Sequence, residues 1–403
     1  CGVRVNFPDI VPEPIGDGAL LADLTTMRVG GPAERLIVAR SRDDLIEHAS
    51  QLWESGEPWM LLGGGSNTVV SDEGFPGTVL LVRNTGATRI TDEGEGSAPG
   101  EVRLRVQAGH DWDSLVAACV DRGWVGIEAL SGIPGLAGAA PIQNIGAYGQ
   151  ELSQVLHSIE FLDLTQREVR RIPAADLELG YRDSIIKQGL EGVVVSIDLM
   201  LTESREETAL GAHAEAPAPT AEVSYAQLAQ ALGVDLGDRV PIRQLRDSVL
   251  RLRASKGMVL DPSDHDSWSS GSFFTNPIVS EQFARSLPED APRFPVGAAE
   301  PAPAVTSLEE LAAGTPLRLP DAAPERTYKL SAAWLIEHAG VKRDFRLPGS
   351  GAAISSKHTL AITNRGGASA ADVAELARFV VQRVQQEFGV ILAPEPNLYG
   401  LEL

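Results

Sequence analysis

Three polar side chains in short, distinctive runs are the best candidates for chemistry. Arg182 lies in GYRDS, Ser272 in GSFFTNP and Glu395 in PEP. A guanidinium binds a carboxylate through two parallel hydrogen bonds, a carboxyl group can carry developing charge, and a hydroxyl donates a proton if its neighbours stabilise the resulting anion. Taken singly, an ion pair with Asp183, a turn serine and a solvated carboxylate remain the simpler interpretations.

Two glycine-rich loops are candidates for ligand binding. GGGSN (63–67) follows the apolar run Trp59–Leu62. Its glycines can turn successive N–H groups toward one point, which is how a backbone nest binds phosphate. Thr68 replaces the third glycine of the dinucleotide fingerprint, so that motif is excluded, and a plain tight turn remains the alternative. The second stretch, Glu128–Gln150, is costly to order without a partner, which favours a large planar ligand.

Taken in order along the chain, these segments resemble the UDP-N-acetylenolpyruvoylglucosamine reductase (UDP-N-acetylmuramate dehydrogenase) family. The segments that carry the resemblance are 63–67, 131–135, 143–149, 180–184, 271–277 and 394–396. The resemblance covers nearly all of the chain from about residue 21. It implies an α+β fold, with a two-subdomain FAD-binding fold of the PCMH type followed by an α/β substrate-binding domain. It also implies FAD and NADPH as cofactors and UDP-N-acetylglucosamine-enolpyruvate as the substrate.

The same resemblance implies a role for individual residues. Arg182 and Glu395 would stabilise an enolate formed by hydride transfer to C3 of the enolpyruvyl group, and Ser272 would protonate C2. The implied cofactor-binding residues are Gly63, Gly64, Gly65, Ser66, Asn67, Ser131, Gly132, Ile133, Pro134, Gly138, Asn144, Gly146, Val193 and Arg253. The implied substrate-binding residues are Tyr225, Lys256, Asn276 and His358, the last standing where some members have glutamine.

Local patterns predict the elements that must position these residues. We expect strands at Arg35–Ala39, Trp59–Leu62, Thr78–Val82, Val102–Gln107, Val193–Leu201, Ala352–Ile354 and Leu360–Thr363. We expect helices from Ser41 to Gly56, from Pro241, at Ser331–Ala339 and at Ser369–Phe388, with capping boxes at Ser41/Asp44 and Ser369/Asp372. Asp113 is predicted to cap a further helix that carries Leu115, Val116 and Cys119.

The expected domain organisation follows from composition and from the resemblance. It comprises a lead-in (1–20), FAD-binding subdomain 1 (21–83), FAD-binding subdomain 2 (84–203), a flexible connector (204–220), a substrate-binding domain (221–394, with an insertion at about 288–326) and a C-terminal catalytic segment (395–403).

Composition excludes several functional classes. The formal net charge of −21 disfavours a nucleic-acid partner, and no apolar run is long enough to span a membrane. Two cysteines make no disulfide framework, which fits a cytoplasmic protein. We expect Cys119 in the core, a trimmed or partial N-terminus at Cys1, a monomer, and no metal site among the scattered histidines, including His265.

Two other functions remain open on the sequence. The first is a sugar or alcohol oxidase of the same flavin fold, although this would leave Ser272 and Glu395 without a role. The second is a non-catalytic flavin- or nucleotide-binding module that uses its third domain to bind partners.

Overall fold

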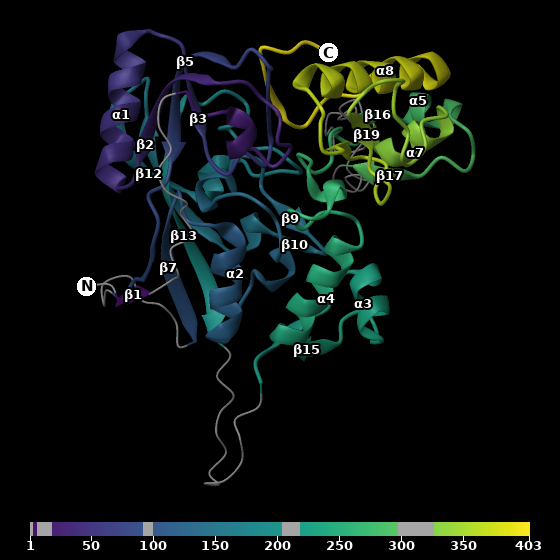
Figure 1. Ribbon diagram of the computed structural model, residues 1–403. Helices are drawn as coiled ribbons and strands as arrows, with labels where there is room; N and C mark the ends of the chain where they lie inside the picture. Colours follow the sequence, from purple (N-terminus) through teal and green to yellow (C-terminus); the bar gives the residue numbers. More distant parts are fainter. Residues whose placement is uncertain (1–2, 6–17, 92–99, 204–217, 297–325) are drawn as a thin grey trace, which may run out of the picture.

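The computed structural model of the protein describes residues 3–5, 18–91, 100–203, 218–296 and 326–403. Two sheets stand side by side, and a helix-rich third region covers one flank of both (Figure 1). The fold is α+β, as predicted. The elements of each part are described below with the cores that hold them together.

The first sheet is parallel, with the order β2-β5-β3. It contains β2 (Ala33–Ala39), β3 (Trp59–Leu62) and β5 (Phe75–Val82), covered by α1 (Arg42–Ser55). The predicted Ser41/Asp44 capping box begins α1, and a left-handed Gly56 ends it. A 3-10 turn (Leu21–Leu24) precedes β2, and β4 (Thr68–Val70) follows the first glycine loop.

The second sheet is antiparallel, with the order β1-β6-β7-β13-β11-β12 and β8 also paired to β13. Its strands are β1 (Val3–Val5), β6 (Ala87–Arg89), β7 (Glu101–Gln107), β8 (Trp124–Val125), β11 (Leu156–Asp163), β12 (Glu168–Pro173) and β13 (Gly192–Glu203). α2 (Trp112–Asp121) lies against it and places Cys119 in the core, as predicted. Burial raises the pKa of that thiol to about 12.

The prediction that Asp113 caps α2 is wrong. Asp111 is the cap, and its carboxylate accepts from Ser114 N at 2.8 Å. The helix begins two residues earlier than expected because Trp112, which is buried, is already its first residue. Asp113 instead accepts hydrogen bonds from Gly132 N and from both terminal nitrogens of Arg246.

The second glycine-rich stretch has almost no regular structure, as its composition indicates. It contains short 3-10 turns at Glu128–Leu130 and Ala137–Ala139 and the strand β9 (Gly146–Ala147), which pairs with β10 (Gln150–Glu151). Further 3-10 turns follow it at Leu152–Gln154 and Ala174–Leu177.

The third region divides between two cores. β14 (Thr220–Glu222), α3 (Ala226–Leu232), β15 (Arg239–Pro241) and α4 (Ile242–Ala254) join the core of the second sheet. A separate core lies among β16 (Ile278–Ser280), α5 (Glu281–Ser286), β18 (Thr327–Leu330), α7 (Ala332–His338), β19 (Ala352–Ile354), β20 (Ile362–Asn364) and α8 (Ala370–Phe388). The largely exposed strand β17 (Arg293–Val296) pairs with β18 at its edge. A 3-10 turn spans His265–Ser267. The predicted Ser369/Asp372 capping box of α8 is confirmed, and a left-handed Gly389 ends the helix.

Three boundary predictions need correction. The expected loose lead-in contains β1, which pairs with β6. The expected connector ends earlier, because Thr220 begins β14, and the expected insertion includes β17, which pairs with β18. In each case the backbone hydrogen bonds of the sheet outweigh a composition that is typical of loops. Residues 204–217 and 297–325 lie outside the described ranges.

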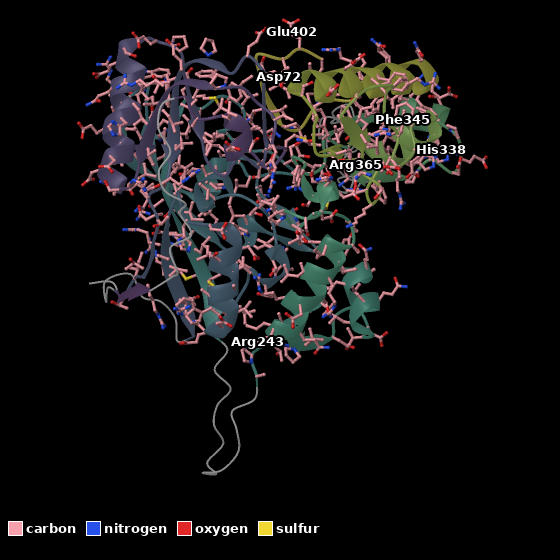
Figure 2. The ribbon with its side chains drawn as sticks, viewed as in Figure 1. Asp72, Arg243, His338, Phe345, Arg365 and Glu402 are labelled. Atoms are coloured by element: carbon pink, nitrogen blue, oxygen red, sulfur yellow. The ribbon has the colours of Figure 1, made fainter. Side chains whose placement is uncertain are left out.

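The C-terminal segment forms a separate two-stranded sheet with β4. β21 (Asn397–Tyr399) runs parallel to β4 beside the first glycine loop. Asp72, labelled in Figure 2 between these parts, accepts hydrogen bonds from the first two backbone amides of α8, at 2.7 Å from Ala370 N and 3.0 Å from Ala371 N. An acidic side chain from one region thus caps a helix of another.

Candidate active site

A cavity of about 330 Å³ lies where the three parts meet, and it brings together residues that are far apart in the chain. All three predicted catalytic residues, Arg182, Ser272 and Glu395, line it. The predicted cofactor-binding residues that line it are Gly63, Gly64, Gly65, Ser66, Asn67, Ile133, Pro134, Gly138, Gly146 and Arg253. Ser131, Gly132, Asn144 and Val193 are absent from its lining.

The two glycine loops face one another at backbone distance. A Cβ on Gly64 would stand 2.9 Å from the Cα of Gly135, and a Cβ on Gly65 would stand 2.1 Å from the carbonyl oxygen of Leu24. Gly65 also has a φ of +62°. The N–H groups of Gly64, Gly65 and Ser66 donate no hydrogen bond to another described residue. This loop therefore offers unpaired donors in a cavity wall, which suits an anionic group such as a diphosphate.

Arg253, at the end of α4, brings a buried cation to the same cavity. One of its terminal nitrogens donates to the Met258 carbonyl at 3.1 Å, whereas its buried Nε has no partner among the described residues. Burial lowers the pKa of this guanidinium, with Asp113 opposing the shift. A buried donor without a partner costs folding free energy. The Arg253 Nε–H is therefore a candidate to donate a hydrogen bond to a bound molecule.

Asp113 holds this side of the cavity together. Its carboxylate accepts from Arg246 at 2.7 and 2.9 Å and from the N–H of Gly132 at 2.6 Å. Gly132 has a φ of +71°, so the loop that carries Ile133 and Pro134 bends where a carboxylate anchors it. Asp113 therefore couples the second glycine loop to α4.

Val193 belongs to the strand that lines the cavity, but its side chain points away from the cavity. Its side chain is buried in the core beside α1, while Gly192 and Val194 line the cavity. Alternate residues of a strand point to opposite faces, which explains the difference.

Arg182 and Glu395 form the only ion pair that either makes among the described residues, with Nε and Oε1 3.6 Å apart. The Glu395 side chain is 12% exposed. Burial raises the pKa of Glu395, and the charges of Arg182 and Lys187 oppose the shift without cancelling it. Asp183 does not compete for the guanidinium, because its carboxylate accepts from Ser184 N and Gln188.

Main-chain pairing sets Ser272 beside Glu395. The N–H of Glu395 donates to the Phe273 carbonyl at 2.9 Å, and Phe273 and Phe274 are buried in the third region's core. From the other side, Asn67 Nδ2 donates to the Glu395 carbonyl at 3.3 Å. The segment that carries Glu395 is thus held between the first glycine loop and the serine segment.

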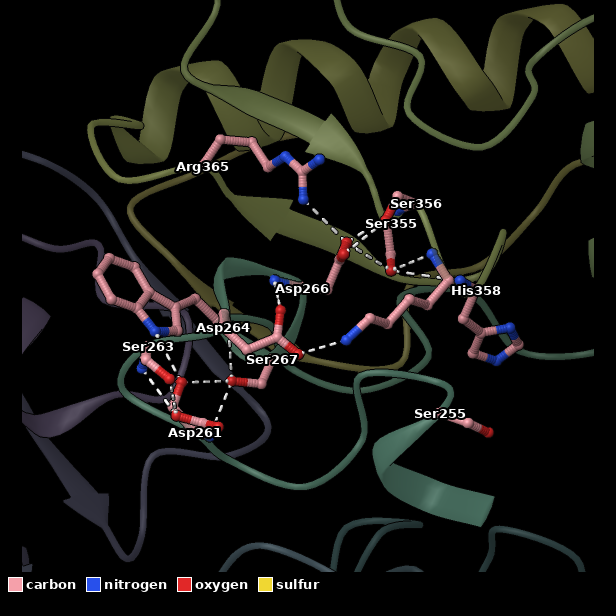
Figure 3. Close-up of polar contacts among 12 residues, drawn as sticks. Ser255, Asp261, Ser263, Asp264, Asp266, Ser267, Ser355, Ser356, His358 and Arg365 are labelled. Carbon is pink, nitrogen blue, oxygen red and sulfur yellow. Dashed lines mark hydrogen bonds and ion pairs between the residues drawn. The ribbon is translucent and has the colours of Figure 1, made fainter. Parts of the chain in front are cut away.

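A polar network fixes the loop that leads to Ser272 (Figure 3). Asp266 is buried and accepts from the hydroxyls of Ser355 and Ser356 at 2.9 and 2.6 Å and from Arg365 at 2.9 Å. Ser355 and Ser356 lie in the loop between β19 and β20, and Arg365 directly follows β20. Because four described hydrogen bonds converge on this carboxylate, Asp266 anchors the loop to the third region's core.

The predicted substrate residues lie outside the lining of the main cavity. Tyr225 and Lys256 lie with Tyr148: the two tyrosine rings are 5.7 Å apart, and the ammonium of Lys256 is 5.6 Å from the Tyr148 ring. Asn276 Nδ2 donates to the hydroxyl of Tyr181 at 3.3 Å. These groups gather beside a second, smaller cavity, lined in part by Tyr148 and Tyr181, that shares Arg182 with the first.

His358 is neutral near pH 7. Burial lowers its pKa to about 4, and the positive charges of Lys256 and Arg343 add to the effect. A neutral imidazole can donate at one nitrogen and accept at the other. His358 can therefore bind a polar ligand, as glutamine would.

Lys187 and Ser270 are among the lining residues that the prediction missed. Lys187 adds a cation near Glu395, and its ammonium donates to the Arg182 carbonyl at 2.8 Å. Ser270 is buried, and its hydroxyl has no partner among the described residues. Lys187 follows GYRDS closely and Ser270 lies two residues before Ser272, so proximity to a motif was the signal available for both.

Within the described ranges, no group of three or more His, Cys, Asp or Glu is placed to hold a metal ion. No helix in the same ranges has both the length and the apolar character needed to cross a membrane.

Comparisons with known proteins agree with this geometry. Residues 33–171 match the family described as FAD binding domain, and residues 261–399 match UDP-N-acetylenolpyruvoylglucosamine reductase, C-terminal domain. A protein from Leifsonia xyli subsp. xyli named UDP-N-acetylenolpyruvoylglucosamine reductase is 56% identical over 96% of this chain and 100% of its own length. One of the same name from Thermobifida fusca is 45% identical over 95% and 97%. The crystal structure of UDP-N-acetylenolpyruvylglucosamine reductase (MurB) from Thermus caldophilus covers 94% of this chain and 97% of its own, at 25% identity and a TM-score of 0.55.

Proposed function

The chain belongs to the UDP-N-acetylenolpyruvoylglucosamine reductase family, and we propose that it is an FAD-dependent oxidoreductase that uses NADPH to reduce UDP-N-acetylglucosamine-enolpyruvate to UDP-N-acetylmuramate. The observation that carries this proposal is the convergence of Arg182, Ser272 and Glu395 on one cavity walled by both glycine loops. The product is a precursor of peptidoglycan, so the protein acts in cell-wall synthesis.

The residues of the cavity fit FAD. The free N–H groups of Gly64, Gly65 and Ser66 would hold its diphosphate. The unpaired Nε of Arg253 would meet an acceptor on the flavin ring, and Ile133 and Pro134 would cover the ring. When bound, FAD carries a hydride from NADPH to C3 of the enolpyruvyl group.

Arg182 and Glu395 would stabilise the charge that develops on the substrate. As C3 gains a hydride, negative charge spreads through C2 into the carboxylate as an enolate. Arg182 is permanently charged and can hold that carboxylate. The raised pKa of Glu395 favours its protonated form, which can donate a hydrogen bond to the same oxygens.

Ser272 would protonate C2. A serine hydroxyl is a weak acid, so it needs cations near the oxygen that it leaves behind. Arg182, Lys187 and Arg253 line the same cavity and supply that charge.

Tyr225, Lys256, Asn276 and His358 would bind the nucleotide sugar. A lysine is a suitable point charge for a diphosphate, and the rim formed with Tyr148 and Tyr181 has room for an extended substrate. We propose two FAD-binding subdomains (21–83 and 84–203), a substrate-binding domain that begins with β14 at Thr220, and a cytoplasmic monomer. The small number of cysteines supports the location.

The first experiment is anaerobic reduction of the purified protein with NADPH. We expect the yellow flavin absorbance to bleach, and to return only when UDP-N-acetylglucosamine-enolpyruvate is added. Reoxidation by oxygen but not by that compound would move the function to the oxidase alternative. Absence of flavin would move it to the binding-module alternative.

Replacing Ser272 tests the proton donor separately. Ser272→Ala should lower turnover by about 100-fold or more, because it removes the acid, while FAD stays bound. Thr275→Val is the matched control, since Thr275 lies in the same segment and is absent from the cavity lining. If Ser272→Ala retains turnover, Ser272 is not the proton donor, whereas the assignment of FAD binding is unaffected.

A further inference from the structure

The side chain of Asn144 is buried and forms its hydrogen bonds within the protein. Asn144 is 3% exposed and has a φ of +41°. Its Nδ2 donates to the Gly180 carbonyl at 3.0 Å and to the Glu151 carboxylate at 3.2 Å, and its Oδ1 accepts from Ser153 N at 3.0 Å. Since an amide nitrogen has two hydrogens, both donors of Asn144 are used before any ligand binds.

The bond to Gly180 reaches the turn that carries the catalytic arginine. Gly180 and Asp183 pair across this turn, and Arg182 inside it has a φ of +54°. Non-glycine residues rarely adopt that conformation, which persists only where the surroundings impose it. The turn therefore needs anchors if the guanidinium is to stay near Glu395.

The anchors come from one short segment of the second glycine loop. Besides the bond from Asn144, Ser184 Oγ donates to the Ile142 carbonyl at 2.6 Å. Ile142 and Gln143 line the main cavity, whereas Asn144 lines only the smaller cavity next to it. One side of this segment thus faces the cofactor cavity, and the other side holds the Arg182 turn.

We propose that Asn144 is a positioning residue for Arg182, and that its side chain does not contact the cofactor. This inference rests on the proposed function, because it gives Arg182 a catalytic role. It replaces the cofactor-binding role that the family resemblance implies for Asn144. Its consequence is that loss of the amide should impair substrate reduction and leave the affinity for FAD unchanged.

The test is Asn144→Asp, which keeps the size of the side chain and the acceptor for Ser153 N but loses both donors. We expect kcat to fall between about 10- and 100-fold, as a displaced catalytic group would cause, and the Kd for FAD to change by less than about threefold. FAD affinity is measured by quenching of flavin fluorescence. A rise in this Kd of about tenfold or more would overturn the proposal.

A double-mutant cycle separates positioning from general destabilisation. Arg182→Lys alone should lower kcat by about 100-fold, because a point charge replaces the two-pronged guanidinium. If Asn144 acts through Arg182, adding Asn144→Asp to that variant should cost less than about twofold more. Full additivity of the two losses would contradict the proposal.

Gln150→Leu is the matched control. It removes hydrogen bonds of similar length in the same loop, to Ala129 N and Glu128, without touching the Arg182 turn. Its effect on kcat should add to that of Arg182→Lys. If Asn144→Asp does not fold, Asn144→Ser is measured in its place. If the wild type fails to reduce the substrate, the proposed function fails, and the Kd for FAD still tests the role of Asn144.

Discussion

At the scale of single residues, burial decides the chemistry of Glu395. Its carboxylate lies 3.6 Å from Arg182 Nε, and the described residues show no hydrogen bond between the two groups. The Coulombic attraction of Arg182 for this carboxylate is therefore weaker than in a hydrogen-bonded ion pair. Loss of hydration therefore outweighs the charges of Arg182 and Lys187, and the pKa of Glu395 is raised. Ser272, by contrast, owes its position to the backbone pairing of Phe273 and Phe274.

The raised pKa predicts how stability depends on pH. The folded protein binds the Glu395 proton more tightly than the unfolded chain, so this contribution is complete below pH ~4 and is lost as pH rises through the raised pKa. Glu395→Gln cannot titrate. The free energy of unfolding of the variant minus that of the wild type should therefore increase over this range and then level off.

Urea unfolding of the FAD-free proteins between pH 4 and pH 8 measures this difference. Asp43→Asn is the control, since the Asp43 side chain is 88% exposed. A constant difference, or one that decreases with rising pH, would mean that the ion pair with Arg182 dominates.

At the scale of elements, the first glycine loop depends on backbone shape. Gly65 combines a positive φ with a backbone oxygen where its Cβ would be, while a Cβ on Gly63 would meet only the Leu136 side chain at 3.6 Å. The two positions differ in how they pack, although both face the cavity. Conformation and packing thus make Gly65 the less replaceable glycine.

Gly65→Ala should lower the free energy of unfolding by at least about 2 kcal/mol, from the left-handed backbone and the clash together. Gly63→Ala should cost less than about 1 kcal/mol, because its added methyl group finds an ordinary contact. Chemical denaturation of the FAD-free variants gives both values. Equal losses would mean that the loop adapts to a side chain at either position.

At the scale of the whole molecule, the cavity exists because three parts are held in register. Thr26 Oγ1 donates to the Ser269 carbonyl at 2.6 Å, and Asn364 Nδ2 donates to the carbonyls of Met27 and Arg28. Asp72 adds the cap on α8. Ser272 and Glu395 come from the far side of this junction, so its stability controls their distance from the glycine loops.

Asp72→Ala should therefore lower the stability of α8 by about 1–2 kcal/mol, the cost of losing a helix cap. Amide hydrogen exchange should quicken in Ala370–Phe388 and remain unchanged in α1. Asp43→Ala, which changes an exposed first-turn residue of α1, is the control. Faster exchange throughout the protein would show that the junction is not a separate unit of stability.

Sequence patterns predicted features that depend on near neighbours. Three kinds of feature are as expected: the capping boxes of α1 and α8, the bounds of β3 and β19, and the burial of Cys119. A helix cap and a repeat of apolar residues both depend on residues only a few positions apart in the chain. The ordered motifs also predicted Arg182, Ser272 and Glu395 as one set, and all three line one cavity.

Features that depend on distant partners became visible only in the fold. The sequence placed Asp113 at a helix cap, but its carboxylate accepts hydrogen bonds from Gly132 N and Arg246 instead. It likewise could not reveal that Asn144 faces Gly180 and Arg182 faces Glu395. A side chain's type sets what it can bind, but its partner, burial and pKa follow from which segments tertiary packing brings within a few ångströms.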